Sequence, residues 1–428
     1  MKFRKDVIQN ISWMYIYRMV RLPLAFIITA WLARFLGPGK YGAYVYAIAI
    51  AELLMLFWSQ GLKEVVIQEI RKSGLDKTEV SVAAFQLMAA GNVILFGLLG
   101  LVLVFFIDEQ VIRVISLLCG LGICFRAFEG FELWFHASLK VRVTIGVQFL
   151  AQLLYIALIA VMIFYEASLS WFGAAYASQL IVTGIGFVVV YWFEKKSILF
   201  FKKLQPLRKK LLTLGKFMIL AKLCFTVSLL VDRVLIEYLI DVEAVGYYAA
   251  AMKLITTWTF ISASISLSFI PIIADVDNDK ERRENMDRMF GWISTAALVL
   301  MIPSYILAEF VVEIIFGEGY SQSIQLFRVL SLSLPFLLLN EGVKVWLITY
   351  NKSKYYIISM VLTVVLCVVG NFLLIPVLGI EGAPLSFLFS WMIGSLFIFF
   401  AFKETRELGR QLLKSFLYPI VFVQKMMR

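Results

Sequence analysis

The stretch of sequence that decides the fold is YYIISMVLTVVLCVVGNFLLIPVLGIEGAPLSFLFSWMIGSLFIFF at residues 355–400, where Glu381 is the single charged residue. An α-helix needs about 20 predominantly apolar residues to cross a hydrocarbon core roughly 30 Å thick. The stretch is therefore long enough for two crossings, which we place at residues 355–377 and 381–402. It predicts helices that are surrounded by lipid rather than by water.

The composition of the chain extends this prediction to its whole length. Of its 428 residues, 61% are hydrophobic and 16% are charged, and the mean hydropathy is +0.88. A soluble globular chain carries roughly 45–50% apolar and about 25% charged residues. We therefore expect an all-α polytopic membrane protein with about twelve crossings. Those before the last two are predicted at residues 11–35, 41–61, 80–107, 111–135, 143–165, 171–193, 214–238, 245–273, 290–308 and 326–350.

The basic residues predict the orientation, because cytoplasmic loops carry an excess of Lys and Arg. With twelve crossings, 29 of the 40 Lys and Arg residues fall on the side of the N-terminus, while Arg34 and Lys40 fall on the opposite side. We therefore expect both termini in the cytoplasm. The net charge of +11 comes mainly from these loops rather than from one basic face, so no nucleic-acid partner is expected.

A weak internal repeat predicts two halves. Tyr41-Gly42-Ala43-Tyr44 matches Val245-Gly246-Tyr247-Tyr248, and residues 171–174 match residues 380–383 at a similar offset. Six crossings per half is an even number, so the two lobes would be parallel repeats around a central cavity. The expected parts are an N-lobe at 1–194, a basic cytoplasmic linker at 195–213, a C-lobe at 214–402 and a tail at 403–428, whose apolar run 416–423 would lie at the membrane interface.

Four basic residues inside the predicted crossings are candidates for substrate binding: Arg18, Arg21, Lys222 and Lys253. Charge at membrane depth is costly, so such side chains normally face a bundle interior or an aqueous cavity. Arg18 and Arg21 are three residues apart and share a helical face. Arginine would grip a diphosphate by its planar fork, and lysine would act as a point charge. The alternative for each is a side chain that snorkels to its nearer interface.

Charged pairs inside the crossings form a second set of candidates, either for ion coupling or for structural pairing. Their members are three or four residues apart, so each pair shares a helical face and can neutralise itself. Structural pairing is the favoured interpretation. The pairs are Arg126 with Glu129, Glu132 with His136, and Glu341 with Lys344.

Two acidic residues have no such partner in sequence. Asp232 is expected to meet a cation on a neighbouring helix, because the adjacent Arg233 points about 100° away from it. Glu52 is the only charged residue in its predicted crossing. It is a candidate ion-binding or proton-binding site.

The sequence lacks the motifs of common enzymes. It contains neither G-x-x-x-x-G-K-[ST], the phosphate-binding loop, nor H-E-x-x-H, the zinc-protease motif. Its single histidine, His136, excludes a site with two histidine ligands. The four cysteines lie inside apolar stretches and are interpreted as packed thiols. We therefore expect no cofactor, no metal site and no enzymatic activity.

Short motifs spaced along residues 10–402 follow a recognisable order. They are Asn10 with Trp13, Leu32-Ala33-Arg34-Phe35-Leu36-Gly37-Pro38 with Tyr41-Gly42, Asp232-Arg233, Val245-Gly246-Tyr247-Tyr248-Ala249-Ala250 with Pro271, Phe316-Gly317 with Tyr320, and Asn371 with Pro376 and Gly379-Ile380-Glu381-Gly382-Ala383. In this order they resemble the polysaccharide (O-antigen-type) flippases of the multidrug/oligosaccharidyl-lipid/polysaccharide exporter superfamily.

The resemblance implies a substrate and a mechanism. An undecaprenyl-diphosphate-linked oligosaccharide would be turned across the bacterial cytoplasmic membrane by alternating access, for surface polysaccharide biosynthesis. Crossings one, two, seven and eight would line the cavity, and these contain Arg18, Arg21, Glu52, Lys222 and Lys253. The implied partners are this lipid-linked oligosaccharide, the lipid bilayer and other membrane proteins of polysaccharide assembly.

Two other functions stay open at this point. A cation-coupled drug or small-molecule antiporter of the same superfamily would have a mainly acidic cavity, whereas crossings one, seven and eight supply more basic residues. A membrane polysaccharide polymerase or ligase would need a large external loop with catalytic residues. The longest external loop that we expect, residues 309–325, is short and acidic.

Overall fold

The computed structural model describes residues 2–72, 76–195, 204–276 and 278–418, with their side chains except those of residues 2–20, 22, 64, 68, 71 and 72. Every regular element in these residues is a helix. The chain divides into two compact units, Met1–Leu36 with Ala43–Leu230 and Gly37–Gly42 with Val231–Arg428.

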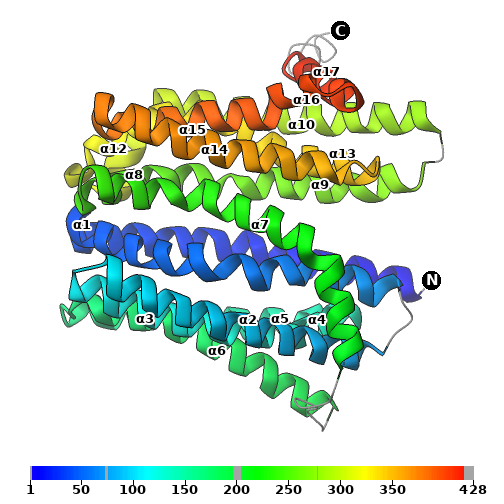
Figure 1. The fold of residues 1–428 in the computed structure, drawn as a ribbon, viewed down its shortest axis with the longest axis horizontal. Helices are drawn as coiled ribbons and strands as arrows, with labels where there is room; N and C mark the ends of the chain where they lie inside the picture. The colour runs from blue at the N-terminus through cyan, green and yellow to red at the C-terminus, as the bar shows by residue number, and fades with distance from the viewer. Residues whose placement is uncertain (1, 73–75, 196–203, 277, 419–428) are drawn as a thin grey trace. The chain divides into compact units, whose positions relative to one another are not determined.

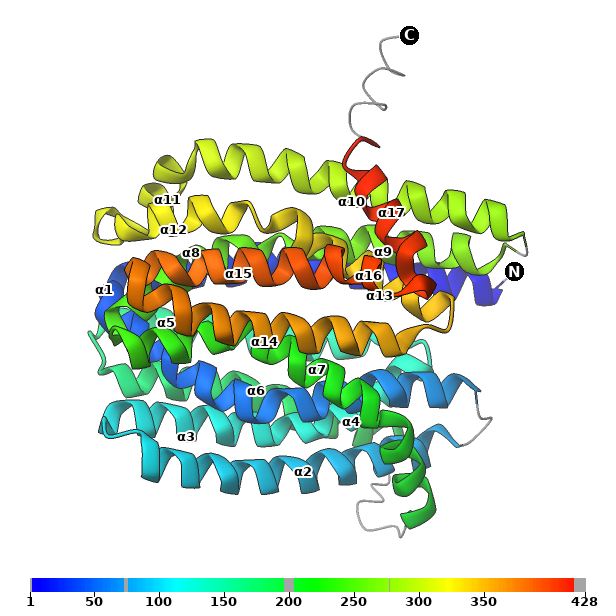
Figure 2. The same ribbon diagram turned by 45° about the horizontal axis from the view of Figure 1, so that its top comes forward.

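The first unit is a helical bundle. α3 packs against α2 and α6, and α5 also packs against α6; Figures 1 and 2 both show α2 and α3 side by side. Its core includes the rings of Phe131 and Tyr191, whose centroids lie 4.7 Å apart. The elements are α1 (Lys2–Lys72), α2 (Lys77–Phe106), α3 (Gln110–Phe125), the 3₁₀ turn Arg126–Phe128, α4 (Glu129–Ala137), α5 (Val141–Phe164), α6 (Leu169–Lys195) and α7 (Gln205–Leu239) as far as Leu230.

The second unit is also a bundle of helices. α14 packs against α15, and α10 packs against α9 and α13; α14 and α15 lie side by side in Figures 1 and 2. Its elements after α7 are α8 (Val242–Thr257), α9 (Thr259–Ala274), α10 (Asp279–Ile306), α11 (Ala308–Phe316), α12 (Gln322–Ser331), α13 (Leu334–Thr349), α14 (Ser353–Leu378), α15 (Gly382–Met392), the π-helical turn Ile393–Phe397, α16 (Ile398–Ala401) and α17 (Arg406–Ser415).

A kink divides α1 into the first two predicted crossings. Gly37 has φ 69° and ψ 169°, a backbone conformation that glycine adopts without the steric penalty of a Cβ. Pro38 follows it. The short segment Gly37–Gly42 beyond the kink belongs to the second unit, although the helix on either side of it belongs to the first.

Within the second unit, this segment crosses the start of α8 at two glycines. A Cβ placed on Gly42 would lie 1.9 Å from the carbonyl oxygen of Val242, and a Cβ on Gly246 would lie 2.1 Å from that of Pro38. Each oxygen belongs to the residue four positions before the opposite glycine. Gly42 and Gly246 are also the matching glycines of the internal repeat. Only residues without a side chain allow two helix backbones to approach this closely.

Breaks in several helices interrupt the predicted crossings. The fourth contains the 3₁₀ turn before α4, and the eighth breaks at Trp258, between α8 and α9. In the tenth, α12 and α13 meet at a bend of 44°. The hydroxyl of Thr257 donates to the Lys253 carbonyl over 2.7 Å and satisfies a backbone group at the α8 break.

Three segments that we expected to be loops are largely helical. α1 continues as far as Lys72, into the loop expected between the crossings 41–61 and 80–107. The expected external loop 309–325 contains α11, the 3₁₀ turn Glu318–Tyr320 and the start of α12. The expected linker 195–213 is helical from Gln205 onward, and residues 196–203 of it lie outside the described residues, as does most of the apolar run 416–423. The apolar runs located the predicted crossings but did not show that the helices continue into the charged segments between them.

The surface has the character that lipid requires. Large apolar side chains such as Ile94, Phe106 and Val377 are 71%, 78% and 78% exposed, on a scale that soluble monomers do not show. Eight helices in the described residues are long and apolar enough to cross a membrane, or nine if the bent pair α12–α13 is one span. The predicted fold class, an all-α polytopic membrane protein, is confirmed. The count of twelve crossings and the two predicted lobes stay predictions.

Candidate functional site

Inside the first unit, charged side chains of alternating sign follow one another. The Arg126 Nε donates to the Glu129 carboxylate over 2.8 Å. The other oxygen of Glu129 lies 3.5 Å from the Lys63 ammonium, and Lys63 also contacts Glu132 over 2.5 Å. Arg126 interacts electrostatically with Glu52 as well. We call Glu52, Arg126, Glu129, Lys63 and Glu132 the charge chain.

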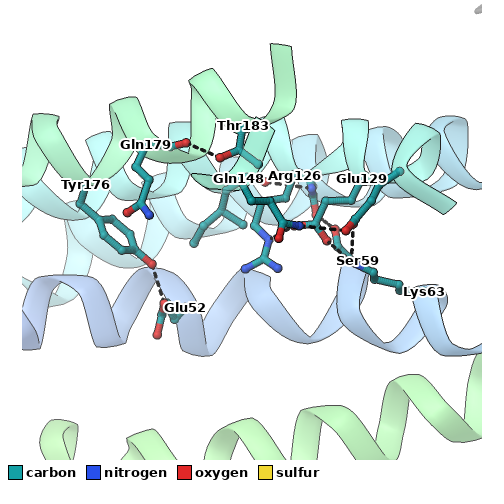
Figure 3. A network of polar contacts seen from close by, with 12 residues as sticks. Glu52, Ser59, Lys63, Arg126, Glu129, Gln148, Tyr176, Gln179 and Thr183 are labelled. Atoms are coloured by element: carbon teal, nitrogen blue, oxygen red, sulfur yellow. Dashed lines mark hydrogen bonds and ion pairs between the residues drawn. The ribbon is translucent and has the colours of Figure 1, made fainter. Parts of the chain in front are cut away.

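Glu132 is the junction at one end of the charge chain. Its side chain is 3% exposed. One carboxylate oxygen accepts the hydrogen bond from Lys63, and the other accepts from Gln148 Nε2 over 2.9 Å and lies 3.3 Å from His136 Nε2. Three donors from α1, α4 and α5 thus stabilise a carboxylate that would be costly to bury alone. Figure 3 shows Lys63, Glu129 and Gln148 gathered at this end.

Glu52 lies at the other end of the charge chain. The Tyr176 hydroxyl donates to its carboxylate over 2.7 Å, and Figure 3 shows this ring pointing from α6 toward Glu52 on α1. A neutral hydroxyl therefore donates directly to this acid. Glu52 is not an isolated charge, although it is the only charged residue of its predicted crossing.

Regular spacing explains how apolar helices bring polar groups to this network. On α5, Gln148 and Gln152 are four residues apart, and on α6, Tyr176, Gln179 and Thr183 follow at intervals of three and four. Residues at these intervals share one helical face. The amide of Gln179 donates to Gln152 over 2.7 Å, which links the polar faces of the two helices.

The second unit contains a separate buried acid, Asp232, which is 0% exposed. Its carboxylate accepts hydrogen bonds from the Tyr248 hydroxyl, from Asn371 Nδ2 over 2.6 Å and from Cys367 Sγ over 3.0 Å. All three donors are neutral, and no ion pair among the described side chains supplies the cation expected on a neighbouring helix. α8 and α14 satisfy this acid with hydrogen bonds instead of with an opposite charge.

The three predicted charge pairs all form. Arg126 pairs with Glu129, and Glu132 lies within ion-pair distance of His136. In the second unit, Lys344 pairs with Glu341 over 3.0 Å, with both side chains 28% exposed. The first two pairs belong to a larger network, whereas the spacing alone predicted isolated pairs.

The predicted basic residues are distributed over several helices. Arg21 is exposed on α1, and the Arg18 side chain lies outside the described ones. Lys222 is half-buried on α7, with its ammonium 4.8 Å from the centre of the Phe225 ring. Lys253 is half-buried on α8, in the second unit. A shared cavity for these four residues stays a prediction.

Lys63 is the main member of the charge chain that the sequence analysis missed. We assigned it to a cytoplasmic loop, but α1 continues past it and directs its ammonium to two buried carboxylates. The available signal was spacing: Glu52, Ser59 and Lys63 are seven and four residues apart and share one face of a helix. Throughout the described part of the chain, no three His, Cys, Asp or Glu side chains gather in a way that could hold a metal ion.

Comparison with solved structures shows the fold. The chain superimposes on a lipid II flippase, MurJ, in an inward closed conformation with a TM-score of 0.70, at 12% identity over 97% of this chain and 93% of that one. It also matches an inward-facing multidrug resistance MATE transporter of the MOP superfamily with a TM-score of 0.67, at 15% identity over 93% of this chain and 99% of that one.

Comparison of sequences gives relatives and a family. The chain is 23% identical to a candidate O-antigen transporter of Shigella flexneri over 354 residues, which cover 77% of this chain and 81% of the relative. It is 20% identical to an uncharacterised membrane protein of Methanocaldococcus jannaschii, over 93% of this chain and 84% of that protein. The family model described as "Polysaccharide biosynthesis protein" matches residues 31–325. The chain therefore belongs to this polysaccharide biosynthesis family.

Proposed function

We propose that this protein translocates an undecaprenyl-diphosphate-linked oligosaccharide across the bacterial cytoplasmic membrane by alternating access, for surface polysaccharide biosynthesis. The observation that carries the proposal is the family match over residues 31–325. The relative from Shigella flexneri, a candidate O-antigen transporter, and the fold shared with a lipid II flippase support a lipid-linked sugar as cargo.

The basic residues at membrane depth supply the chemistry for such a cargo. A diphosphate carries negative charge that must leave water to cross the bilayer, and cationic side chains stabilise it there. Arg18 and Arg21 would form bidentate hydrogen bonds with phosphate oxygens, and Lys222 and Lys253 would act as point charges. The prenyl tail would stay in lipid, so these residues contact only the polar head of the cargo.

The proposal includes a location and partners. The excess of Lys and Arg on one side of the predicted crossings supports an inner-membrane protein with both termini in the cytoplasm. The lipid bilayer and other membrane proteins of polysaccharide assembly are the expected partners. The protein would act without enzymatic chemistry, because moving the lipid-linked sugar breaks no covalent bond.

Export of surface glycan in cells tests this function. Arg18→Ala and Lys253→Ala should each abolish export while the protein remains inserted in the membrane at wild-type level. Arg34→Ala is a matched control, because Arg34 lies at the predicted outer end of the first crossing, 11–35. Normal glycan export in both Arg18→Ala and Lys253→Ala cells would refute the cationic site.

The acids of the charge chain favour one alternative, a cation-coupled drug or small-molecule antiporter. Buried carboxylates such as Glu129 and Glu132 are the groups that coupling ions use. A flippase moves fluorescent polyprenyl-diphosphate oligosaccharide between the leaflets of proteoliposomes, whereas an antiporter exports small cationic dyes against an ion gradient. Dye export without movement of the lipid would replace the proposed function by the alternative.

A further inference from the structure

The helix α17 presents two different faces. One face, which includes Leu408 and Leu412, is buried against α10 and α16 of its own unit, and Figures 1 and 2 both show α17 next to α16. The opposite face, continued by the turn after α17, is exposed and combines two leucines with three basic residues. These are Leu413 and Leu417, which are 46% and 59% exposed, and Arg406, Arg410 and Lys414. Such a face matches a partner that offers apolar surface and negative charge together.

Polar contacts hold α17 in this orientation. The side-chain oxygen of Gln411 accepts a hydrogen bond from Trp346 Nε1 on α13 over 2.8 Å. The single acid within α17, Glu407, pairs with Arg283 on α10 over 2.9 Å. Because this acid contacts a cation of its own unit, while the basic residues of α17 are exposed, the outer face of the helix is positively charged.

The contacts of α17 with α10 indicate the depth of its exposed leucines relative to the predicted membrane. The ninth predicted crossing begins at residue 290, within α10. The Ser415 hydroxyl lies 2.6 Å from the hydroxyl of Ser294, and a Cβ on Gly291 would lie 2.4 Å from the Tyr418 ring. The end of α17 is therefore level with the first turns of this crossing, where the hydrocarbon core begins.

An aromatic residue marks the same level. Trp292, the neighbour of Gly291 on α10, is 42% exposed, and tryptophan is enriched where the hydrocarbon core meets the headgroups. The exposed leucines of α17 thus lie at a depth that favours acyl chains over water. Leucines at this boundary, with Lys and Arg beside them, are features of helices that bind at the membrane interface.

The basic residues favour one class of headgroup. Arginine, such as Arg410, can bind phosphate oxygens through two parallel hydrogen bonds, and lysine, such as Lys414, attracts phosphate as a point charge. Phosphatidylcholine carries a compensating positive charge, whereas phosphatidylglycerol is negatively charged. Clusters of Lys and Arg at the membrane surface therefore favour anionic lipid. An acidic protein would match the charge of this face, but leucines at the depth of acyl chains favour lipid.

We propose that the exposed face of α17 is a binding site for anionic phospholipid in the leaflet on the predicted cytoplasmic side. Leu413 and Leu417 insert among the acyl chains, and Arg406, Arg410 and Lys414 contact headgroup phosphates. The site anchors the second unit to the membrane surface, because α17 is bonded to α10 and α13. The bound lipid stays in its leaflet and is separate from the transported cargo.

Native mass spectrometry of the full-length protein in detergent micelles tests the site, because it counts the lipids bound to each molecule. Wild type should bind phosphatidylglycerol more tightly than phosphatidylcholine with the same acyl chains, and added salt should weaken only the former. Each Lys or Arg near a membrane surface contributes a factor of about five in affinity, so Arg410→Gln combined with Lys414→Gln should weaken the tightest binding of phosphatidylglycerol about 30-fold.

Arg34→Gln combined with Lys40→Gln is the matched control. It also removes two exposed positive charges, on the predicted outer side, and should bind phosphatidylglycerol like wild type. Both double variants change exposed side chains, so each should unfold at the temperature of wild type. The proposal is overturned if the α17 variant keeps the affinity of wild type for phosphatidylglycerol, or if wild type binds the two lipids equally.

Photocrosslinking in cells tests the site in its own membrane. Leu413→p-benzoylphenylalanine should form adducts with phospholipid, which mass spectrometry of the labelled peptide identifies. Glu281→p-benzoylphenylalanine should form none, because Glu281 is exposed on α10 about 14 Å before the ninth crossing, at ~1.5 Å per residue. An adduct of residue 413 with another protein, or the absence of a lipid adduct there, overturns the proposal.

Discussion

Replacing Gly42 by alanine should measurably loosen the second unit. The new methyl group would lie 1.9 Å from the Val242 carbonyl oxygen, and ordinary van der Waals contact begins at 3.4 Å, so the two helices must separate by about 1.5 Å. The obstacle is backbone, so no rotamer change can relieve it. Overpacking costs typically ~1–3 kcal/mol, and we expect the upper part of that range, about 2–3 kcal/mol.

Thermal unfolding in detergent can measure this loss with a thiol-reactive dye. The four cysteines are free and three are buried, so they react as the chain unfolds. A loss of about 2–3 kcal/mol should lower the apparent midpoint by about 4–12 °C, at ~2–4 °C per kcal/mol for a unit of this size. Gly97→Ala is the control, because a Cβ there meets nothing within 4 Å.

Gly246→Ala sharpens the test, because its Cβ would meet the Pro38 carbonyl oxygen across the same crossing. One separation of the helices relieves both clashes, so the double variant with Gly42→Ala should lose less stability than the two single losses together. The reasoning fails if Gly42→Ala unfolds at the same temperature as Gly97→Ala, or if the two losses simply add.

Three further predictions use the same unfolding assay. Lys63→Met removes the cation that Glu132 and Glu129 share and should lower the free energy of unfolding by about 2–4 kcal/mol. This is less than the ~3–5 kcal/mol of a fully buried pair, because the Lys63 side chain is 26% exposed. Adding Glu132→Gln to this variant should restore part of the lost stability. Asp232→Leu strands three buried donors and should destabilise by about 2–5 kcal/mol, whereas Asp232→Asn, of the same size, should cost less; equal losses would contradict the hydrogen-bond account. Gly379→Ala forces a side chain onto φ 62° and should cost about 1–2 kcal/mol, an effect absent from Gly319→Ala, where φ is not positive.

The sequence was sufficient for the fold class because lipid imposes a simple rule on composition. A chain that must satisfy every backbone group inside a bilayer forms helices, and long apolar runs such as 355–400 identify them. Breaks within those runs were harder to predict. Neither glycine nor proline stands at Trp258, where α8 ends and α9 begins, so the sequence offered no local signal for this break.

The charged pairs could be predicted because helical spacing is local, and the network that joins them could not. Glu132 and His136 are four residues apart, but Lys63 lies 69 residues from Glu132 in sequence. We ended the second crossing at residue 61, where the apolar run ends, and this boundary placed Lys63 in a loop. Its ion pairs with Glu129 and Glu132 were therefore not predicted. The partners of Asp232 could not be predicted for a related reason. Its donors, Tyr248, Cys367 and Asn371, are neutral residues that are typical of a packed core.

The segment Gly37–Gly42 has a consequence for how the two halves could be separated. The repeat suggests cutting the gene near residues 195–213, yet contacts assign Gly37–Gly42 to the second unit and Gln205–Leu230 to the first. In the first unit, the backbone of Ile219 lies against Gly61, and Lys210 pairs with Glu69. Each half of the sequence thus contributes a segment to the unit that the other half mainly forms, as in a domain swap. A fragment cut at the linker would lack the segment that the other half of the sequence contributes to its unit. Gene duplication could therefore produce this architecture, whereas splitting the gene at the linker would leave both units incomplete.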